Sequence, residues 1–185
     1  MFNSNIFDYL GVEDNQVLLQ NASEKYKLIF EYEKKEILNL LGNVCIAIEH
    51  IGSTSIKGLV AKPIVDIAVG VLDMHTLESI PPIMIMEGYQ YLSEHGDHDR
   101  LLFIKKKNGK CFLHIHVEIY QGKSWENHLL FKKYLEHNSK ALLEYSELKE
   151  RLAAEYYNDR KLYTVGKADF IQSCLKEIKK TSIII

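Results

Sequence analysis

The sequence predicts a single domain of the α+β class. Residues 23–41 and 139–156 carry apolar side chains at intervals typical of amphipathic helices. Residues 63–71 are rich in β-branched side chains, and Asn108-Gly109 separates two further strand-like runs. With 185 residues and 46% hydrophobic content, the chain is long enough for one core. Because no linker rich in Pro, Gly or Ser divides it, we expect residues 1–185 to form one domain.

The first predicted helix begins after Asn21 or Ser23, either of which can cap it, and ends at Gly42. A β-branched run at residues 44–48 follows and leads into a strand that ends at Ile51. The apolar side chains of the helix are Tyr26, Ile29, Phe30, Ile37, Leu40 and Leu41.

Residues 49–71 are the stretch that most strongly indicates a binding site. They read as a strand, a Gly/Ser/Thr turn, a short irregular or helical link, and a second strand. Small residues at the turn let backbone N–H groups approach an anion, and the hydroxyls of Ser53, Thr54 and Ser55 add donors. Asp66 lies inside the second strand, where a carboxylate is costly unless it is paired or binds a metal. A phosphate-binding turn followed by an acid within a strand predicts a nucleotide site.

The middle of the chain is less regular. Residues 73–88 favour a helix, but the prolines at 81 and 82 predict a break or a fresh helix start at Pro82, because proline lacks the N–H that a helix needs. We expect a short strand over residues 89–92 and a polar loop over residues 93–100. That loop contains a candidate metal cluster of His95, His98 and Asp99. The alternative is that these side chains simply face solvent.

Residues 101–107 and 110–120 are predicted to pair as a hairpin, because Asn108-Gly109 is the favoured dipeptide for a type I′ turn. The second strand alternates, so its side chains divide between two faces. The apolar face, expected to pack on helices, consists of Cys111, Leu113, Ile115, Val117 and Ile119. The other face must meet water or a cleft and consists of Phe112, His114, His116, Glu118 and Tyr120. Two of its polar members could converge on a metal ion or a phosphate; a wet hairpin face is the alternative.

The C-terminal part reads as helical. Residues 125–157 indicate two helices, of which the second starts near Asn138 or Ser139. Residues 158–164 indicate a break, and residues 167–179 a final amphipathic helix.

The composition narrows the class of function. A formal net charge of -2 and a pI near 6.4 give no overall attraction to nucleic acid or to anionic membranes. We interpret the lysines at 105–107 as a solvated hairpin face. Three cysteines without a Cys-x-x-Cys pair suit a reducing compartment, and no signal peptide or run of membrane-spanning length is recognised. We therefore expect a cytoplasmic protein with no membrane partner and no nucleic acid indicated.

Residues 50–67 (His-Ile-Gly-Ser-Thr-Ser-Ile-Lys-Gly-Leu-Val-Ala-Lys-Pro-Ile-Val-Asp-Ile) resemble the signature segment of the GrpB family. That family is placed in the nucleotidyltransferase superfamily, which is related to polymerase beta. The resemblance implies a mixed β-sheet flanked by helices, in which the Gly-Ser turn opens the site and the hairpin strand borders it. It covers nearly the whole chain, through Gly88-Tyr89, residues 100–103, 113–116, 125–135 and 145–149, to Tyr163 and Lys167.

The superfamily pattern is a hydrophobic residue, Gly, then Gly or Ser, followed about a dozen residues later by Asp-hydrophobic-Asp/Glu-hydrophobic. Residues 51–53 and 66–69 fit this pattern except at Ala68. In such sites two carboxylates on one strand face hold two Mg²⁺ ions, so Ala68 removes one ligand. Two further departures are Lys57, where the family commonly has Pro, and residues 132–133, where Lys-Lys replaces Arg-Asp.

The resemblance implies a role for each residue around this motif. Gly52, Ser53 and Thr54 would hold the phosphates of a nucleotide, and Lys62 would help to neutralise them. Asp66 and Glu118 are the expected catalytic carboxylates. The expected ligands of Mg²⁺ are Asp66, Glu118 and His116, and the expected substrate contacts from the hairpin strand are His114 and His116.

Two functions remain open at this point. The first is Mg²⁺-dependent transfer of a nucleoside monophosphate from an NTP to an unknown acceptor. The alternative, favoured by Ala68, is a catalytically degenerate regulatory protein that binds a nucleotide or a phosphorylated metabolite. Because some relatives are fused to dephospho-coenzyme A kinase, the resemblance also implies a link with coenzyme A metabolism.

Overall fold

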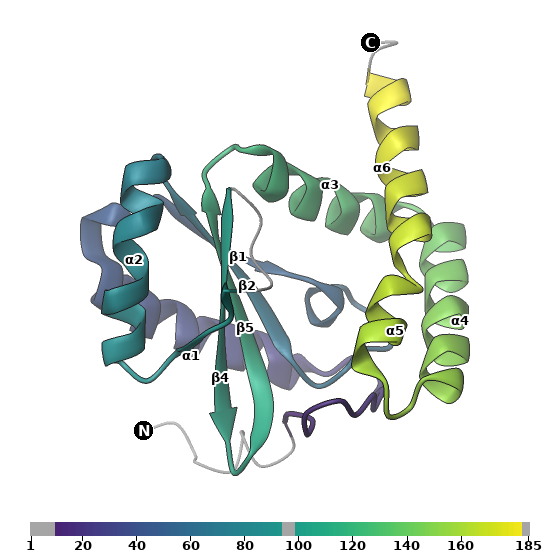
Figure 1. Cartoon of the computed structure of the whole chain (residues 1–185). Helices are drawn as coiled ribbons and strands as arrows, with labels where there is room; N and C mark the ends of the chain where they lie inside the picture. Colours follow the sequence, from purple (N-terminus) through teal and green to yellow (C-terminus); the bar gives the residue numbers. More distant parts are fainter. Residues whose placement is uncertain (1–9, 94–98, 183–185) are drawn as a thin grey trace.

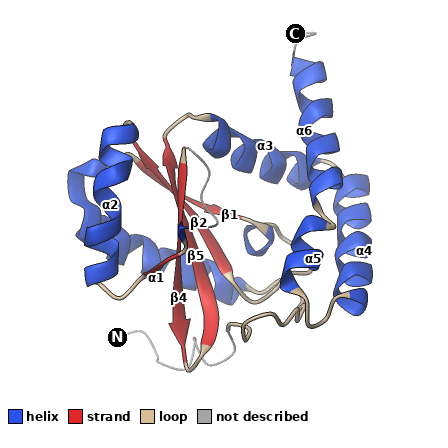
Figure 2. Ribbon diagram, in the orientation of Figure 1, coloured by secondary structure: helices blue, strands red, loops and turns tan. Residues whose placement is uncertain are grey.

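The computed structural model describes residues 10–93 and 99–182, with no side-chain description at 181 and 182. Their centre is a five-stranded sheet in the order β1-β2-β5-β4-β3 (Figures 1 and 2). β2 and β5 are parallel and the other neighbours antiparallel, so the sheet is mixed and the predicted α+β class is confirmed. The strands are β1 (Ala47–Ile51), β2 (Val65–Val71), β3 (Gln90–Tyr91), β4 (Arg100–Lys107) and β5 (Lys110–Ile119).

Helices cover both faces of this sheet. α1 and α2 lie on one side, while α3 to α6 lie on the other, and the C-terminal end of α6 projects away from the body (Figure 1). The helices are α1 (Glu24–Leu41), α2 (Met74–Met86), α3 (Lys123–His137), α4 (Ser139–Glu155), α5 (Arg160–Val165) and α6 (Ala168–Ser182), with 3₁₀ turns at Gly42–Val44 and Ser53–Ser55.

The main hydrophobic core lies between the sheet and the α1/α2 layer. It fixes β2 and β5 beside each other, because each contributes alternate side chains to it, and each such side chain stabilises the fold by roughly 1.5–3 kcal/mol. The other face of the same two strands is thereby turned toward α3 to α6. The core includes Ile29 and Ile37 of α1, Leu77 and Ile80 of α2, Val65, Ile67 and Val69 of β2, and Leu113, Ile115 and Val117 of β5.

Several predicted boundaries are confirmed. Ser23 caps α1 by accepting a hydrogen bond from the N–H of Lys25, and Gly42 ends the helix with a φ of 54°. Asn108 and Gly109 have φ values of 52° and 77° between the antiparallel strands β4 and β5, as a type I′ turn requires.

The break predicted at Pro82 is wrong, because α2 runs through both prolines from its N-cap, Asp73. Prolines at 81 and 82 deprive two carbonyls of the preceding turn of their donors. The helix persists because Leu77, Ile80 and Met84 are buried against the sheet, and burial of an apolar face outweighs propensity.

One further prediction about element positions is wrong. The break predicted at residues 158–164 contains α5, which begins after Asp159, whose side chain accepts from the N–H of Leu162. The strand predicted to end at Ile51 is confirmed as β1, which begins at Ala47 after the 3₁₀ turn that follows α1.

The strict alternation predicted along β5 is interrupted by a bulge. Lys105 faces Leu113 and Lys106 faces Cys111, which leaves Phe112 as an extra residue. Phe112 therefore joins the main core instead of the polar face. Cys111 instead lies near Arg160, whose charge opposes the rise that burial causes in the Cys111 pKa.

The lysines at 105–107 are less solvated than predicted. Lys105 contacts both carboxylate oxygens of the buried Glu33, at 3.2 and 3.0 Å, and Lys106 lies 2.7 Å from Asp14. These pairs tie the hairpin to α1 and to the N-terminal segment.

His95 and His98 of the predicted loop lie outside the described residues. Across the described residues, every helix is too short or too polar to cross a membrane.

Candidate functional site

The parallel pairing of β2 with β5 builds the site. Asp66 lies opposite His114, Ala68 opposite His116 and Gly70 opposite Glu118. Since side chains alternate along a strand, these residues share the sheet face that α3 to α6 cover. The structure thus places Asp66 beside His114 and His116, while Glu118 lies further along the strand.

Asp66, His114 and Arg160 form a connected chain of hydrogen bonds. His114 Nδ1 lies 2.8 Å from Asp66 Oδ1, and Arg160 lies 2.7 Å from His114 Nε2. Arginine can only donate, so Nε2 must be the acceptor and Nδ1 must carry the proton that Asp66 accepts. His114 is therefore a neutral imidazole that orients the Asp66 carboxylate.

Asp66 is ionised in this arrangement. Burial disfavours its charge, but hydrogen bonds from His114 and His116 outweigh burial and lower its pKa well below the ordinary value. His116 Nε2 lies 3.8 Å from Asp66 Oδ1. The Asp66 side chain keeps 25% of its exposure, so a ligand can reach it.

The Gly-Ser turn closes directly over Asp66. Gly52 has a φ of 69°, and a Cβ built on it would lie 2.8 Å from the Cβ of Asp66. Any side chain at this position would displace the carboxylate or the turn. Gly52 is therefore required both by its backbone conformation and by its contact with Asp66.

The hydroxyls of the turn hold its shape. Thr54 Oγ1 donates to the carbonyl of Ile64 and lies 3.1 Å from His50 Nε2, and Ser55 Oγ donates to the carbonyl of Gly52. Burial lowers the pKa of His50 to about 4, so His50 is neutral. The Thr54 hydroxyl, expected to hold a phosphate, is thus engaged by the protein itself.

Four cationic side chains surround Asp66: Lys62, Lys149, Arg160 and Lys167. Burial, followed by repulsion from Arg160 and Lys167, lowers the pKa of Lys62 to about 7. Burial, followed by repulsion from Lys167, lowers that of Lys149 to about 7. The pKa of Lys167 falls to about 8, and the Asp66 charge opposes all three shifts.

Aromatic rings and one carbonyl hold the lysines in place. Lys62 and Lys167 lie 5.3 and 4.4 Å from the ring centre of Tyr163, and Lys149 lies 5.4 Å from that of Tyr145. Lys149 also donates to the carbonyl of Val60. The basic cluster, by which we mean these lysines with Arg160, therefore consists of side chains held in fixed positions.

Sequence reasoning identified only Lys62 of this basic cluster. One signal pointed to Lys149, which lies on the apolar stripe of α4 between Tyr145 and Leu152 and is only 1% exposed. Arg160 was missed because α5 was read as a break.

Glu118 does not join Asp66. It is fully buried, and His128 Nε2 of α3 lies 3.0 Å from its Oε1. Glu118 lies opposite Gly70, which is four residues after Asp66 on β2. At the rise per residue of a strand, Glu118 is therefore roughly 13 Å along the sheet from Asp66. The expected pair of catalytic carboxylates is therefore separated. His128, which sequence reasoning missed, lies beside Glu118 instead.

Ala68 offers no ligand for the usual two-Mg²⁺ arrangement. It is completely buried and packs with Ile51 and Trp125 in an apolar cluster. Among the described residues, the possible metal-binding group at Asp66 therefore contains one carboxylate, Asp66, and the imidazoles of His114 and His116. This donor set does not fit two Mg²⁺ ions, which prefer carboxylate and phosphate oxygens.

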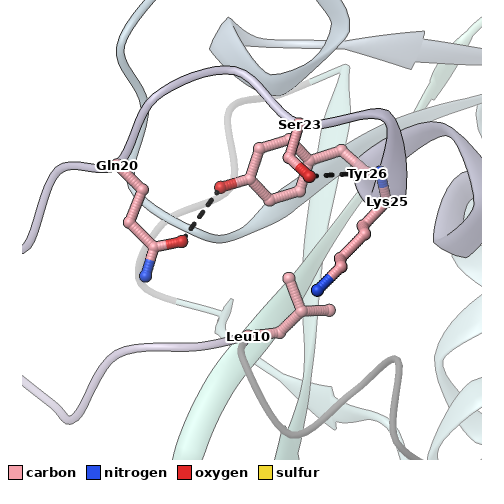
Figure 3. Close-up of a pocket in the computed structure, with 5 residues that line it drawn as sticks. All are labelled: Leu10, Gln20, Ser23, Lys25 and Tyr26. Atoms are coloured by element: carbon pink, nitrogen blue, oxygen red, sulfur yellow. Dashed lines mark hydrogen bonds between the residues drawn. The ribbon is translucent and has the colours of Figure 1, made fainter.

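A separate pocket of about 240 Å³ lies at the start of α1, lined by Leu10, Gln20, Ser23, Lys25 and Tyr26 (Figure 3). Tyr26 donates to Gln20 across it at 3.4 Å. It shares no residue with the surroundings of Asp66.

Comparisons with known proteins agree with this architecture. Residues 16–177 match the model of the GrpB protein family. The glutamate-rich protein GrpB of Alkalihalophilus pseudofirmus is 37% identical over 91% of this chain and 99% of that protein. The crystal structure of the conserved protein GrpB from Enterococcus faecalis is 29% identical, covers 89% of this chain and 99% of its own, and has a TM-score of 0.79.

A more distant likeness concerns the fold alone. The Cid1 poly(U) polymerase, solved with MgGTP bound, superposes with a TM-score of 0.52 at 12% identity, over 72% of this chain and 44% of that one. The fold of the sheet and its helices thus resembles that of a nucleotidyltransferase, and the chain belongs to the GrpB family.

Proposed function

We propose that this protein binds the phosphate groups of a nucleoside triphosphate, or of a similarly phosphorylated metabolite, beside Asp66. The observation that carries the proposal is the basic cluster. Four buried or half-buried cations repel one another around a single ionised carboxylate. Such an arrangement is costly unless an anion enters it, and a polyphosphate carries enough negative charge to balance it.

Each part of the site has a role in this proposal. Lys62, Lys149 and Lys167 donate to phosphate oxygens, as ammonium groups do in other phosphate sites. The backbone of the Gly52–Ser53 turn, whose glycine leaves no Cβ in the way, contacts the same group. Asp66, which lies directly against this turn, borders the same group.

Transfer of a nucleoside monophosphate is the second candidate function. The nucleotidyltransferase type of fold and the ionised Asp66 favour it. Asp66 together with phosphate oxygens would supply ligands for one Mg²⁺ ion, which would neutralise charge on the phosphates. The apolar packing of Ala68 favours binding without rapid transfer, as in a regulatory protein that senses a nucleotide.

Calorimetric titration with inorganic tripolyphosphate and with each NTP tests the binding. Lys62→Met should weaken binding about 10- to 100-fold, since a hydrogen bond to a charged group is worth roughly 1.5–3 kcal/mol. The same change should stabilise the ligand-free protein, because it removes a buried, repelled charge. Lys133→Met, which changes an exposed lysine of α3, is the matched control and should do neither.

Two results separate the candidate functions. Release of pyrophosphate from an NTP with Mg²⁺, abolished by Asp66→Asn, would establish transfer. Tight NTP binding that needs no Mg²⁺ and releases no pyrophosphate would establish a binder. Failure of tripolyphosphate and of every NTP to bind would overturn the proposal itself.

A further inference from the structure

We propose that His116, Glu118 and His128 form a binding site for a first-row transition-metal ion such as Zn²⁺. One donor atom from each residue lies within 4.8 Å of the others. The residues come from two elements, β5 and α3, that pack against each other. The sequence predicted a Mg²⁺ site of Asp66, Glu118 and His116; the structure exchanges Asp66 for His128 and changes the preferred metal.

Unsatisfied buried atoms are the first argument for this site. Glu118 has no exposed surface, yet both of its carboxylate oxygens lack a hydrogen-bond partner. His116 Nδ1 is also buried without a partner. Buried polar atoms are almost always hydrogen-bonded or bound to a metal. Three such atoms on neighbouring residues of one strand face therefore point to a missing cation.

The contact between Glu118 and His128 is the second argument. His128 Nε2 lies 3.0 Å from Glu118 Oε1, yet Oε1 has no hydrogen-bond partner. Two ligands that share one metal at about 2.0–2.2 Å are themselves roughly 3 Å apart. The spacing is that of neighbouring metal ligands.

The trio of Asp66, His114 and His116 offers a contrast within the same molecule. Its donor atoms are also close together. There, however, Asp66 accepts from His114, and His114 accepts from Arg160, so the chain is complete without a metal. A cation would have to displace an arginine. In the His116–Glu118–His128 trio no cation is bonded in this way among the described residues: Arg100 lies opposite Glu118 in the sheet, yet both Glu118 oxygens remain without a hydrogen bond.

The donor set determines the class of metal. Two imidazoles and one carboxylate suit Zn²⁺, Fe²⁺, Mn²⁺ or Co²⁺, whereas Mg²⁺ prefers oxygen ligands. The side chain of His128 is 27% exposed, which gives an ion a route into the otherwise buried site. Three protein ligands leave a position open for water or for a further ligand.

Metal analysis and titration test the site in the whole chain, prepared without a polyhistidine tag. Protein dialysed against Zn²⁺ and then against buffer should retain about one equivalent per chain, and Mg²⁺ in large excess should not displace it. His128→Ala should reduce Zn²⁺ affinity by a factor of 100 or more. Glu118→Gln, which keeps the volume of the side chain, should do the same.

Two control variants keep the test decisive. His137→Ala removes an exposed histidine of the same helix and should leave Zn²⁺ binding unchanged. His75→Ala, which removes an exposed histidine of α2, should also leave it unchanged. Full Zn²⁺ affinity in His128→Ala would overturn the inference, and so would loss of affinity in His75→Ala with retention in His128→Ala. Either result leaves the test of phosphate binding untouched.

Discussion

At the scale of single residues, Gly52 and Asp66 determine each other's position. The turn can approach the carboxylate only because Gly52 has no side chain and a φ of 69°. Gly58 offers a matched comparison, since its φ is 83° but a Cβ there would meet nothing within 4 Å. Both glycines therefore have a positive φ, but only a side chain at Gly52 would collide with Asp66.

Gly52→Ala is expected to cost more than Gly58→Ala. Backbone strain at positive φ costs about 1–2 kcal/mol at either position. The clash with Asp66 should add about 1–3 kcal/mol at Gly52 alone and should abolish tripolyphosphate binding. Urea unfolding and calorimetry measure both effects. Equal losses at the two positions would show that the contact with Asp66 carries no energy.

Ala68→Asp tests whether the site has merely lost a metal ligand. Because Ala68 is completely buried among apolar side chains, we expect the charge to destabilise the fold by about 2–4 kcal/mol. Ala68→Asn, of the same shape without the charge, should cost less. A stable Ala68→Asp variant that gains Mg²⁺ binding would show that the position still serves a two-metal site.

The residues of the site differ in how readily the sequence reveals them. Gly52 and Asp66 lie in one short stretch, and His114 follows from the alternation of a single strand. Arg160 and Lys167 approach Asp66 only through the packing of helices against the sheet. Nothing local distinguishes such cations from the solvated lysines of any amphipathic helix, so tertiary structure was needed to find them.

At the scale of elements, α2 and α5 show where local signals mislead. In α2 the prolines at 81 and 82 predicted a break, but the buried face of the helix holds it together. α5 spans only six residues, too few for an apolar period to be recognised. The strands and hairpin were predicted correctly because alternation and an Asn-Gly turn are strong over short lengths.

Replacing Pro82 by alanine should stabilise the protein. Pro82 is exposed within α2, so alanine restores a helical hydrogen bond without disturbing the core. We expect a gain of about 1–3 kcal/mol, less than the full propensity difference because the unfolded chain becomes more flexible. Urea unfolding measures it, with Glu78→Ala as a control on the same exposed surface. A loss of stability would mean that the prolines fix the entry into β3.

At the scale of the whole molecule, the lysines near Asp66 couple stability to pH. Lys62 and Lys149 titrate near pH 7 in the folded chain, against an ordinary value of 10.5 when unfolded. Between these values the unfolded chain binds more protons, so the free energy of unfolding should rise with pH. A bound polyphosphate should reverse this pH dependence of stability, because its negative charge favours the protonated lysines.

Binding of tripolyphosphate at pH 8 should therefore take up protons. At that pH the ligand-free lysines at 62 and 149 are mostly neutral, and the anion raises their pKa. Calorimetry in buffers of different ionisation enthalpy measures the uptake, which should be larger at pH 8 than at pH 6. In Lys62→Met it should fall. Binding at pH 8 without proton uptake would contradict the assignment of these lysines.

The packing of Trp125 has a consequence for observing the molecule in solution. It is the single tryptophan of the sequence, it is 4% exposed, and its ring lies 5.4 Å from that of Tyr120. It also lies one helical turn before His128 on α3, so both side chains project from the same side of the helix. Its fluorescence therefore comes from one known place. Co²⁺ at His128 would quench that emission, whereas Zn²⁺, with a filled d shell, would leave it bright.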